Sequence, residues 1–184
     1  MGQRKTYRSE LRATAVERHG YVTAHDVARL GIPRKVLADL VDAGELVRVT
    51  DGLYRLDGIP KTRWHTFAEA VLRAGHGAAL SHDAVLALHG LVEHDPGRVR
   101  VIAPGPVHDR LPQHIEVHHC QVDPADLTAY RGILSTTISR ALLDCRPLLA
   151  AALLVHAADE AVGRGLLLRR ERNAVLECLY LSGP

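Results

Sequence analysis

The sequence predicts an α+β protein, in which a small N-terminal domain of three helices and a β-hairpin precedes a larger mixed α/β domain. Three observations lead to this prediction. Apolar residues recur at helical spacing in three segments between residues 8 and 43, an Asp-Gly pair separates two short strand-forming runs, and helical and strand-forming segments alternate after residue 64. The chain of 184 residues has room for two small domains, and Gly58-Ile59-Pro60 marks the boundary between residues 1–60 and 61–184.

The first helix is expected over residues 8–19. Leu11, Ala15, Val16 and His19 fall on one face at helical spacing, and Gly20 follows as a residue that can end the helix.

The second helix has clear signals at its start. Thr23 is a suitable N-cap, and Asp26 three residues later completes a Thr-x-x-Asp capping box. Val22 and Val27 occupy the positions of a hydrophobic staple, in which the residue before the cap packs on the first turn. Gly31 is expected to end this helix.

A third helix is predicted over residues 33–43, after a very short connection. Pro33 suits the first helical position because proline has no N–H group to leave without an acceptor. The apolar stripe comprises Val36, Leu37, Leu40 and Val41. Arg34 and Lys35 lie on the opposite face, and Gly44 ends the helix.

A β-hairpin is predicted next. The runs 46–49 and 53–56 are rich in strand formers, and Thr50-Asp51-Gly52 connects them. Asp-Gly is a strong hairpin signal because both residues tolerate a positive φ. The order of helix, helix, tight turn, helix and hairpin is the plan of a winged helix-turn-helix, with residues 33–43 as the recognition helix and 46–56 as the wing.

The second domain is expected to mix helices and strands. Ser81 is a candidate cap for a helix over 83–89. The other helices are predicted at 65–74, 137–144, 149–163 and 169–179, and the strands at 98–103, 115–119 and 132–135.

Charge is distributed unevenly along the chain, although the total is only +2. Residues 1–63 hold twelve Lys/Arg against eight Asp/Glu, a net charge of +4, and residues 64–184 hold eleven against thirteen, a net charge of −2. A polyanionic partner is therefore expected to meet the N-terminal domain.

The candidate DNA-binding residues are polar or basic and lie in or beside the helix-turn-helix and wing. Arg34 and Lys35 stand at the N-terminal end of the predicted recognition helix, where side chains reach base edges in the major groove. Thr23 begins a helix whose N–H groups suit a phosphate. The remaining candidates are placed on the wing or in the linker: Arg48, Thr50, Arg55, Lys61 and Arg63.

Nothing in the sequence indicates an enzyme, a metal site or a membrane protein. The chain has no nucleophile-elbow, Walker or Gly-x-Gly-x-x-Gly motif, so no catalytic residues and no cofactor are expected. Twelve histidines occur, but adjacent His118 and His119 point to opposite faces of a strand, and no metal ligands are expected. Three widely spaced cysteines indicate a reducing, cytoplasmic location, and Cys145 and Cys178 are expected in the core.

The N-terminal sequence resembles the winged-helix domain of AbiEi-type antitoxins. The resemblance lies in the stretch from Val22-Thr23-Ala24 to Ala43-Gly44-Glu45-Leu46-Val47-Arg48, and then in Gly52-Leu53-Tyr54-Arg55. The second domain is similar to that family in its Leu-Ser-His and Leu-His-Gly-Leu segments, 80–82 and 88–91, and in residues 132–144. The chain departs from the family pattern at Ala141, where threonine is usual, and at Ala84, where serine is common.

This resemblance implies a transcriptional regulator that acts as the antitoxin of a toxin–antitoxin operon. It implies an N-terminal domain that binds operator DNA and represses its own operon, a second domain linked to antitoxin action, and a nucleotidyltransferase-like toxin as a partner. Since one winged helix offers a small interface, we expect two copies on an inverted-repeat operator, as a homodimer at least when bound to double-stranded DNA. The alternative is a protein-interaction module that binds a toxin or another protein and touches DNA only weakly.

Overall fold

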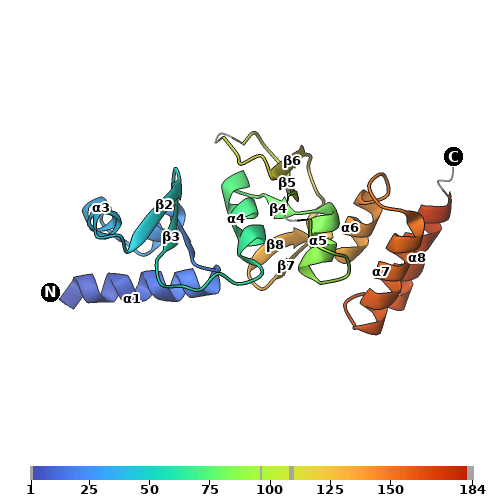
Figure 1. Ribbon diagram of the computed structural model, residues 1–184, viewed down its shortest axis with the longest axis horizontal. Helices are drawn as coiled ribbons and strands as arrows, with labels where there is room; N and C mark the ends of the chain where they lie inside the picture. Colours follow the sequence, from blue (N-terminus) through green and yellow to red (C-terminus); the bar gives the residue numbers. More distant parts are fainter. Residues whose placement is uncertain (1, 96, 108–109, 182–184) are drawn as a thin grey trace.

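The computed structural model describes residues 2–95, 97–107 and 110–181, with side chains from residue 7 to residue 180 inside those ranges (Figure 1). The residues in these ranges form helices and two separate sheets, which confirms the predicted α+β class. The N-terminal elements lie at one end of the molecule and the last two helices at the other end (Figure 1).

The N-terminal part has the order of elements expected from the sequence, with one additional strand. Its elements are α1 (Gly2–Glu17), β1 (Tyr21–Thr23), α2 (Ala24–Arg29), α3 (Arg34–Asp42), β2 (Leu46–Thr50) and β3 (Leu53–Leu56). The predicted first helix therefore begins earlier than residue 8. β1 was not predicted, and it pairs antiparallel with β3 to give a three-stranded sheet of order β1-β3-β2.

Local capping and turn signals are confirmed where helices and strands meet. Thr23 caps α2, and both hydrogen bonds of the capping box with Asp26 are present. α2 and α3 are separated by a short turn in which Gly31 has a φ of 63°, and Pro33 is the N-cap of α3 rather than its first residue. β2 and β3 form the predicted hairpin, in which Gly52 has a φ of 69° and the register shifts between Arg48 and Thr50.

The second part contains a mixed five-stranded sheet of order β6-β5-β4-β8-β7. Its strands are β4 (Ala79–Leu80), β5 (Val99–Ala103), β6 (Ile115–His119), β7 (Leu127–Tyr130) and β8 (Ile133–Thr136). β5 pairs parallel with β6, and β4 with β8, while the β4–β5 and β7–β8 pairs are antiparallel. β4 and β7 were not predicted.

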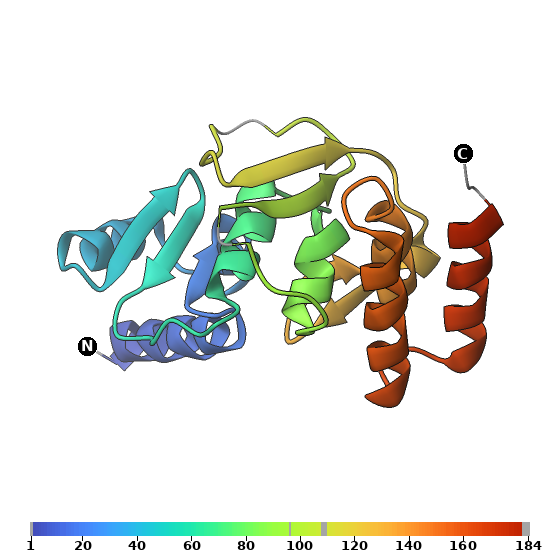
Figure 2. The same cartoon turned by 45° about the vertical axis from the view of Figure 1, so that its right-hand side comes forward.

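The helices of the second part follow the prediction closely. They are α4 (His65–Ala74), α5 (His82–Leu88), α6 (Ile138–Asp144), α7 (Ala151–Gly163) and α8 (Arg169–Leu181), and a 3-10 turn spans Pro124–Asp126. α7 and α8 pack side by side at the end of the molecule farthest from α1 (Figure 2). No helix in the described ranges is long and apolar enough to cross a membrane.

Among the residues that the structure describes, two apolar clusters form the interior, and the larger one crosses from one part to the other. The smaller cluster lies among α1, α2, α3 and one face of the N-terminal sheet. Tyr21 and Leu53, on the opposite face of that sheet, belong instead to the large cluster of the second part. Cys145 is buried as expected, but Cys178 is exposed, so its predicted place in the core was wrong.

A polar contact reinforces this shared core. Tyr21 is 1% exposed, and its hydroxyl donates to Glu69 of α4 at 2.5 Å. Arg73 donates to the same carboxylate at 2.7 Å. Burial acts to raise the pKa of Glu69, but these two hydrogen bonds and the charge of Arg73 outweigh it and hold that pKa below its ordinary value. The N-terminal sheet is therefore fixed to α4 by both packing and hydrogen bonding.

Candidate nucleic-acid interface

α3 presents an apolar face to the core and a polar face to solvent. Leu40 is 1% exposed, and Val36, Leu37 and Val41 pack around the smaller cluster. The opposite face contains the exposed residues Arg34, Lys35, Ala38 and Asp42. This amphipathic division leaves the N-terminal half of the outer face basic, as the sequence predicts.

Three arginines of the N-terminal part already have carboxylate partners. Arg8 pairs with Glu45, Arg18 with Asp26 at 3.1 Å, and Arg48 with Asp51. Arg34 and Lys35 differ from them, because neither has a hydrogen-bond or ion-pair partner in the part of the chain that the structure describes. Their charges are therefore not neutralised within that part of the molecule, which favours contact with an external anion.

The β2–β3 hairpin contributes fewer available groups than the sequence suggests. Arg48 is exposed and pairs with Asp51 in the connecting turn. Thr50 is half-buried beside the register shift of β2. An exposed ion pair is weak, so Arg48 can exchange Asp51 for a phosphate at small cost.

Thr23 is engaged inside the protein, which differs from its expected role as a phosphate contact. Its N–H and hydroxyl both donate to Asp26, at 3.0 and 2.7 Å, and the N–H of Asp26 donates back to the hydroxyl. Burial acts to raise the pKa of Asp26, but the Thr23 hydrogen bonds and the charges of Arg18 and Arg29 outweigh it and lower that pKa. A buried carboxylate at this helix start repels phosphate, so Thr23 has a capping role.

Arg55 also lies elsewhere than expected. Its guanidinium donates to the carbonyl oxygen of Ile59 at 2.6 Å, so the side chain is half-buried against the linker and does not extend from the hairpin. The reason is strand alternation: Arg55 shares the sheet face of Leu53, which packs toward the second part. Lys61 and Arg63 are exposed in the linker, as expected.

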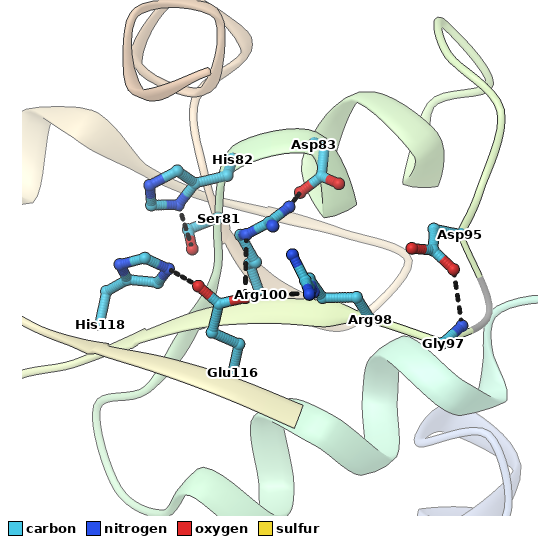
Figure 3. Close-up of polar contacts among 9 residues, drawn as sticks. All are labelled: Ser81, His82, Asp83, Asp95, Gly97, Arg98, Arg100, Glu116 and His118. Carbon is cyan, nitrogen blue, oxygen red and sulfur yellow. Dashed lines mark hydrogen bonds and ion pairs between the residues drawn. The ribbon is translucent and has the colours of Figure 1, made fainter. Parts of the chain in front are cut away.

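A charged network in the second part was not found from the sequence, because its members come from separate elements (Figure 3). Arg100 of β5 is only 5% exposed and donates to Asp83 at 2.7 Å. It also pairs with Glu116 of β6 at 3.3 Å, and Glu116 in turn contacts His118 at 3.1 Å. This network ties α5 to the edge strand β6.

Two histidines meet at the end of that network (Figure 3). The ring of His82 stacks on that of His118 with 4.3 Å between centroids, and His82 has a φ of 53°, which is uncommon for a residue with a side chain. Burial, followed by the neighbouring charge of His118, lowers the pKa of His82. Among the described residues, no three His, Cys, Asp or Glu side chains are grouped so that they could hold a metal ion.

Because of His82, the free energy of unfolding is expected to decrease as the pH falls. Because its pKa is lower in the folded protein than in the unfolded chain, the unfolded chain binds more protons, and the stabilisation is lost as pH falls below about 6.5. Urea unfolding of His82→Gln and of wild type from about pH 7.5 to pH 5 measures the free energy of unfolding at each pH. The slope of that free energy against pH should be smaller in the variant. His156→Gln, on an exposed side chain, is the control, and equal slopes in all three proteins would contradict the prediction.

Comparison with known proteins finds a family likeness in the N-terminal part of the chain. Residues 9–56 match the model of a family described as transcriptional regulator, AbiEi antitoxin, which confirms the resemblance over α1 to β3. That description is of a regulator and antitoxin, not of an enzyme. A crystal structure of the RV2827C protein from Mycobacterium tuberculosis aligns with a TM-score of 0.48 and 21% identity, over 97% of this chain and 72% of that chain. A search of curated proteins gave no match.

Proposed function

We propose that the chain is a cytoplasmic, DNA-binding transcriptional repressor that acts as the antitoxin of a toxin–antitoxin operon and represses that operon through its operator. In this proposal residues 1–60 form a winged helix-turn-helix, α3 is the recognition helix, and the β2–β3 hairpin is the wing. The toxin is expected to be nucleotidyltransferase-like and encoded beside this protein. Residues 61–184 form the domain linked to antitoxin action.

One observation carries the DNA-binding part of the proposal. The N-terminal end of α3 exposes Arg34 and Lys35, neither of which has a partner in the described part of the chain. Side chains at this end of a recognition helix reach guanine O6 and N7, for which arginine and lysine are the usual donors. Arg48 on the hairpin and Lys61 and Arg63 in the linker are assigned to backbone phosphates, while Thr50 is a neighbouring polar contact.

A second candidate function is a protein-interaction module, and a groove in the second part favours it. A cavity of about 530 Å³ is bordered by Leu143, Pro147, Leu149, Leu154 and Leu179, on α6, α7, α8 and the connection between α6 and α7. Arg146 also lines this groove, so a groove of this kind suits a segment of another protein that has both apolar and polar side chains. It leaves the α3 surface free, so both functions can exist in one chain.

Selection from a random pool of duplexes tests the proposed function directly. The full chain should enrich one sequence and bind it at least a thousandfold more tightly than scrambled duplex, with affinity falling steeply as salt rises. Binding without sequence enrichment and with a shallow salt slope would favour the interaction module. Co-purification with the product of the adjacent gene then tests the toxin partnership separately.

The stoichiometry on DNA is expected to be two chains per operator. A single winged helix buries little DNA surface, and two-fold symmetry doubles the contact on an inverted repeat. Native mass spectrometry of the complex with the full selected duplex should show two copies, and with a half-site one copy. A single copy on the full duplex, at saturating protein, would be inconsistent with this arrangement.

A further inference from the structure

The junction between the two parts holds two arginine side chains against one indole ring. Trp64 is the N-cap residue of α4, directly after the linker. The guanidinium of Arg63 lies 4.6 Å from the centre of the indole, and that of Arg131 lies 4.2 Å from it. Lys61 is exposed a few residues earlier in the linker. A single aromatic side chain thus positions one cation from the linker and one from the second part.

Arg131 is fixed in place by its backbone. It lies in the turn between β7 and β8 with a φ of 50°, a conformation rare for a residue other than glycine. Its carbonyl oxygen accepts a hydrogen bond from Nε2 of His19 at 2.9 Å, and His19 itself has a φ of 55°. The other ring nitrogen of His19 contacts the Thr62 hydroxyl at 3.1 Å.

Those contacts define the arrangement of hydrogens. Since a carbonyl oxygen only accepts, Nε2 of His19 carries the hydrogen, and in the neutral ring Nδ1 accepts from Thr62. His19 therefore links α1, the linker and the β7–β8 turn. Two strained residues bonded to each other indicate a site that the surrounding structure maintains against local preference.

The junction has more positive charge and more N–H donors than acceptors. Lys61, Arg63 and Arg131 are exposed, and none of the three has a carboxylate partner among the residues that the structure describes. Two further donors nearby, Nε1 of Trp64 and Nε of Arg55, are buried without an acceptor in that part of the chain. A surplus of positive charges and N–H donors over carboxylates and other acceptors attracts anionic oxygens.

We propose that Lys61, Arg63 and Arg131 form a phosphate-binding patch, which contacts the DNA backbone outside the base pairs that face α3. This inference rests on the proposed function, because the same duplex is to be held at both places. A DNA backbone presents successive phosphates, and guanidinium groups bind phosphate through two parallel hydrogen bonds. Stacking on Trp64 limits the freedom of both arginines beforehand and so reduces the entropy lost on binding. The second part of the chain then contacts DNA directly through Arg131.

The test uses the full chain and the duplex that wild type selects, lengthened by one helical turn on each side. The variants are Arg63→Gln, Arg131→Gln and their combination, and fluorescence anisotropy gives the affinity at several salt concentrations. Removing one phosphate contact should lower the slope of log affinity against log salt by about 0.9, which corresponds to about fivefold weaker binding at about 0.15 M salt. The combined variant should lose about twice that slope.

Three comparisons separate the possible causes of a loss. Arg170→Gln removes the same charge from an exposed position on α8, far from the junction, and should bind as wild type does (Figure 1). Arg131→Lys keeps the charge and should restore most of the slope, which a merely structural arginine would not allow. Shortening the duplex to the selected base pairs should remove the difference between wild type and the combined variant.

The outcomes distinguish this inference from the proposed function. If wild type selects a sequence but Arg63→Gln and Arg131→Gln keep its salt slope on the long duplex, the patch does not bind phosphate and the proposed function stands. If wild type selects no sequence, the proposed function fails and the patch with it. If Arg170→Gln lowers the salt slope as much as Arg63→Gln or Arg131→Gln does, only the net charge of the protein matters, and the proposed patch is wrong.

Discussion

Replacing Arg34 by alanine is expected to weaken binding to the selected duplex by about 1–3 kcal/mol, which is about fivefold to 150-fold. The guanidinium is exposed at the first turn of α3 and has no partner in the described part of the chain, so nothing there competes with a guanine for it. The loss should be much smaller on a scrambled duplex. Anisotropy titrations of both duplexes at two salt concentrations give the two losses.

Arg48→Ala is the matched comparison for that result. Arg48 lies on the hairpin, and its assigned contact is a phosphate, so its removal should weaken both duplexes alike and lower the salt slope by about 1. If Arg34→Ala loses the same affinity for the selected and the scrambled duplex, Arg34 also contacts a phosphate. The role of reading bases would then pass to Lys35.

Replacing Arg100 by methionine is expected to destabilise the second part strongly, although the side chain is charged and not apolar. Its buried guanidinium holds Asp83 at 2.7 Å and Glu116 at 3.3 Å, and methionine leaves both carboxylates without it. Removing one partner of a buried ion pair costs about 3–5 kcal/mol, and the partial exposure of both carboxylates points to the lower end, about 3 kcal/mol. Urea unfolding monitored by circular dichroism measures the free energy of unfolding.

Arg98→Met provides the control on the same strand region. Arg98 contacts the same Glu116 at 3.4 Å, but its side chain is 55% exposed, so its loss should cost at most about 1 kcal/mol. Adding Asp83→Asn to Arg100→Met should recover part of the stability, because it removes the Asp83 charge that Arg100 compensated, whereas Glu116 keeps its contact with Arg98. Equal stability of the Arg98 and Arg100 variants would show that the network does not hold α5 to the sheet.

Elements with strong local signals could be predicted from the sequence. The capping box at Thr23, the turn before α3 and the Asp51-Gly52 hairpin each depend on residues only a few positions apart, and all three are present. β1, β4 and β7 were missed because they are short and are defined by the strands beside them. A run of two to four residues carries too little pattern to separate a strand from a loop.

The exposed residues of the candidate site could be predicted where exposure follows from helical spacing or from a place in the linker. Arg34 and Lys35 lie opposite the apolar stripe of α3, and the structure places both on the surface. The place of Arg55 could not be predicted, because its contact with the Ile59 carbonyl depends on how the linker packs against β3. The Arg100 network and the Arg131–Trp64 contact join distant segments, so one sequence without a structure could not reveal them.

Methylation interference on the selected duplex tests the central claim most directly. Methylating guanine N7 blocks the position in the major groove to which Arg34 or Lys35 is expected to donate, without changing the backbone phosphates. We expect methylation at one or two guanines in each half of the selected sequence to abolish binding of the full chain. Binding that tolerates N7 methylation at every guanine would contradict base reading by the N-terminal end of α3.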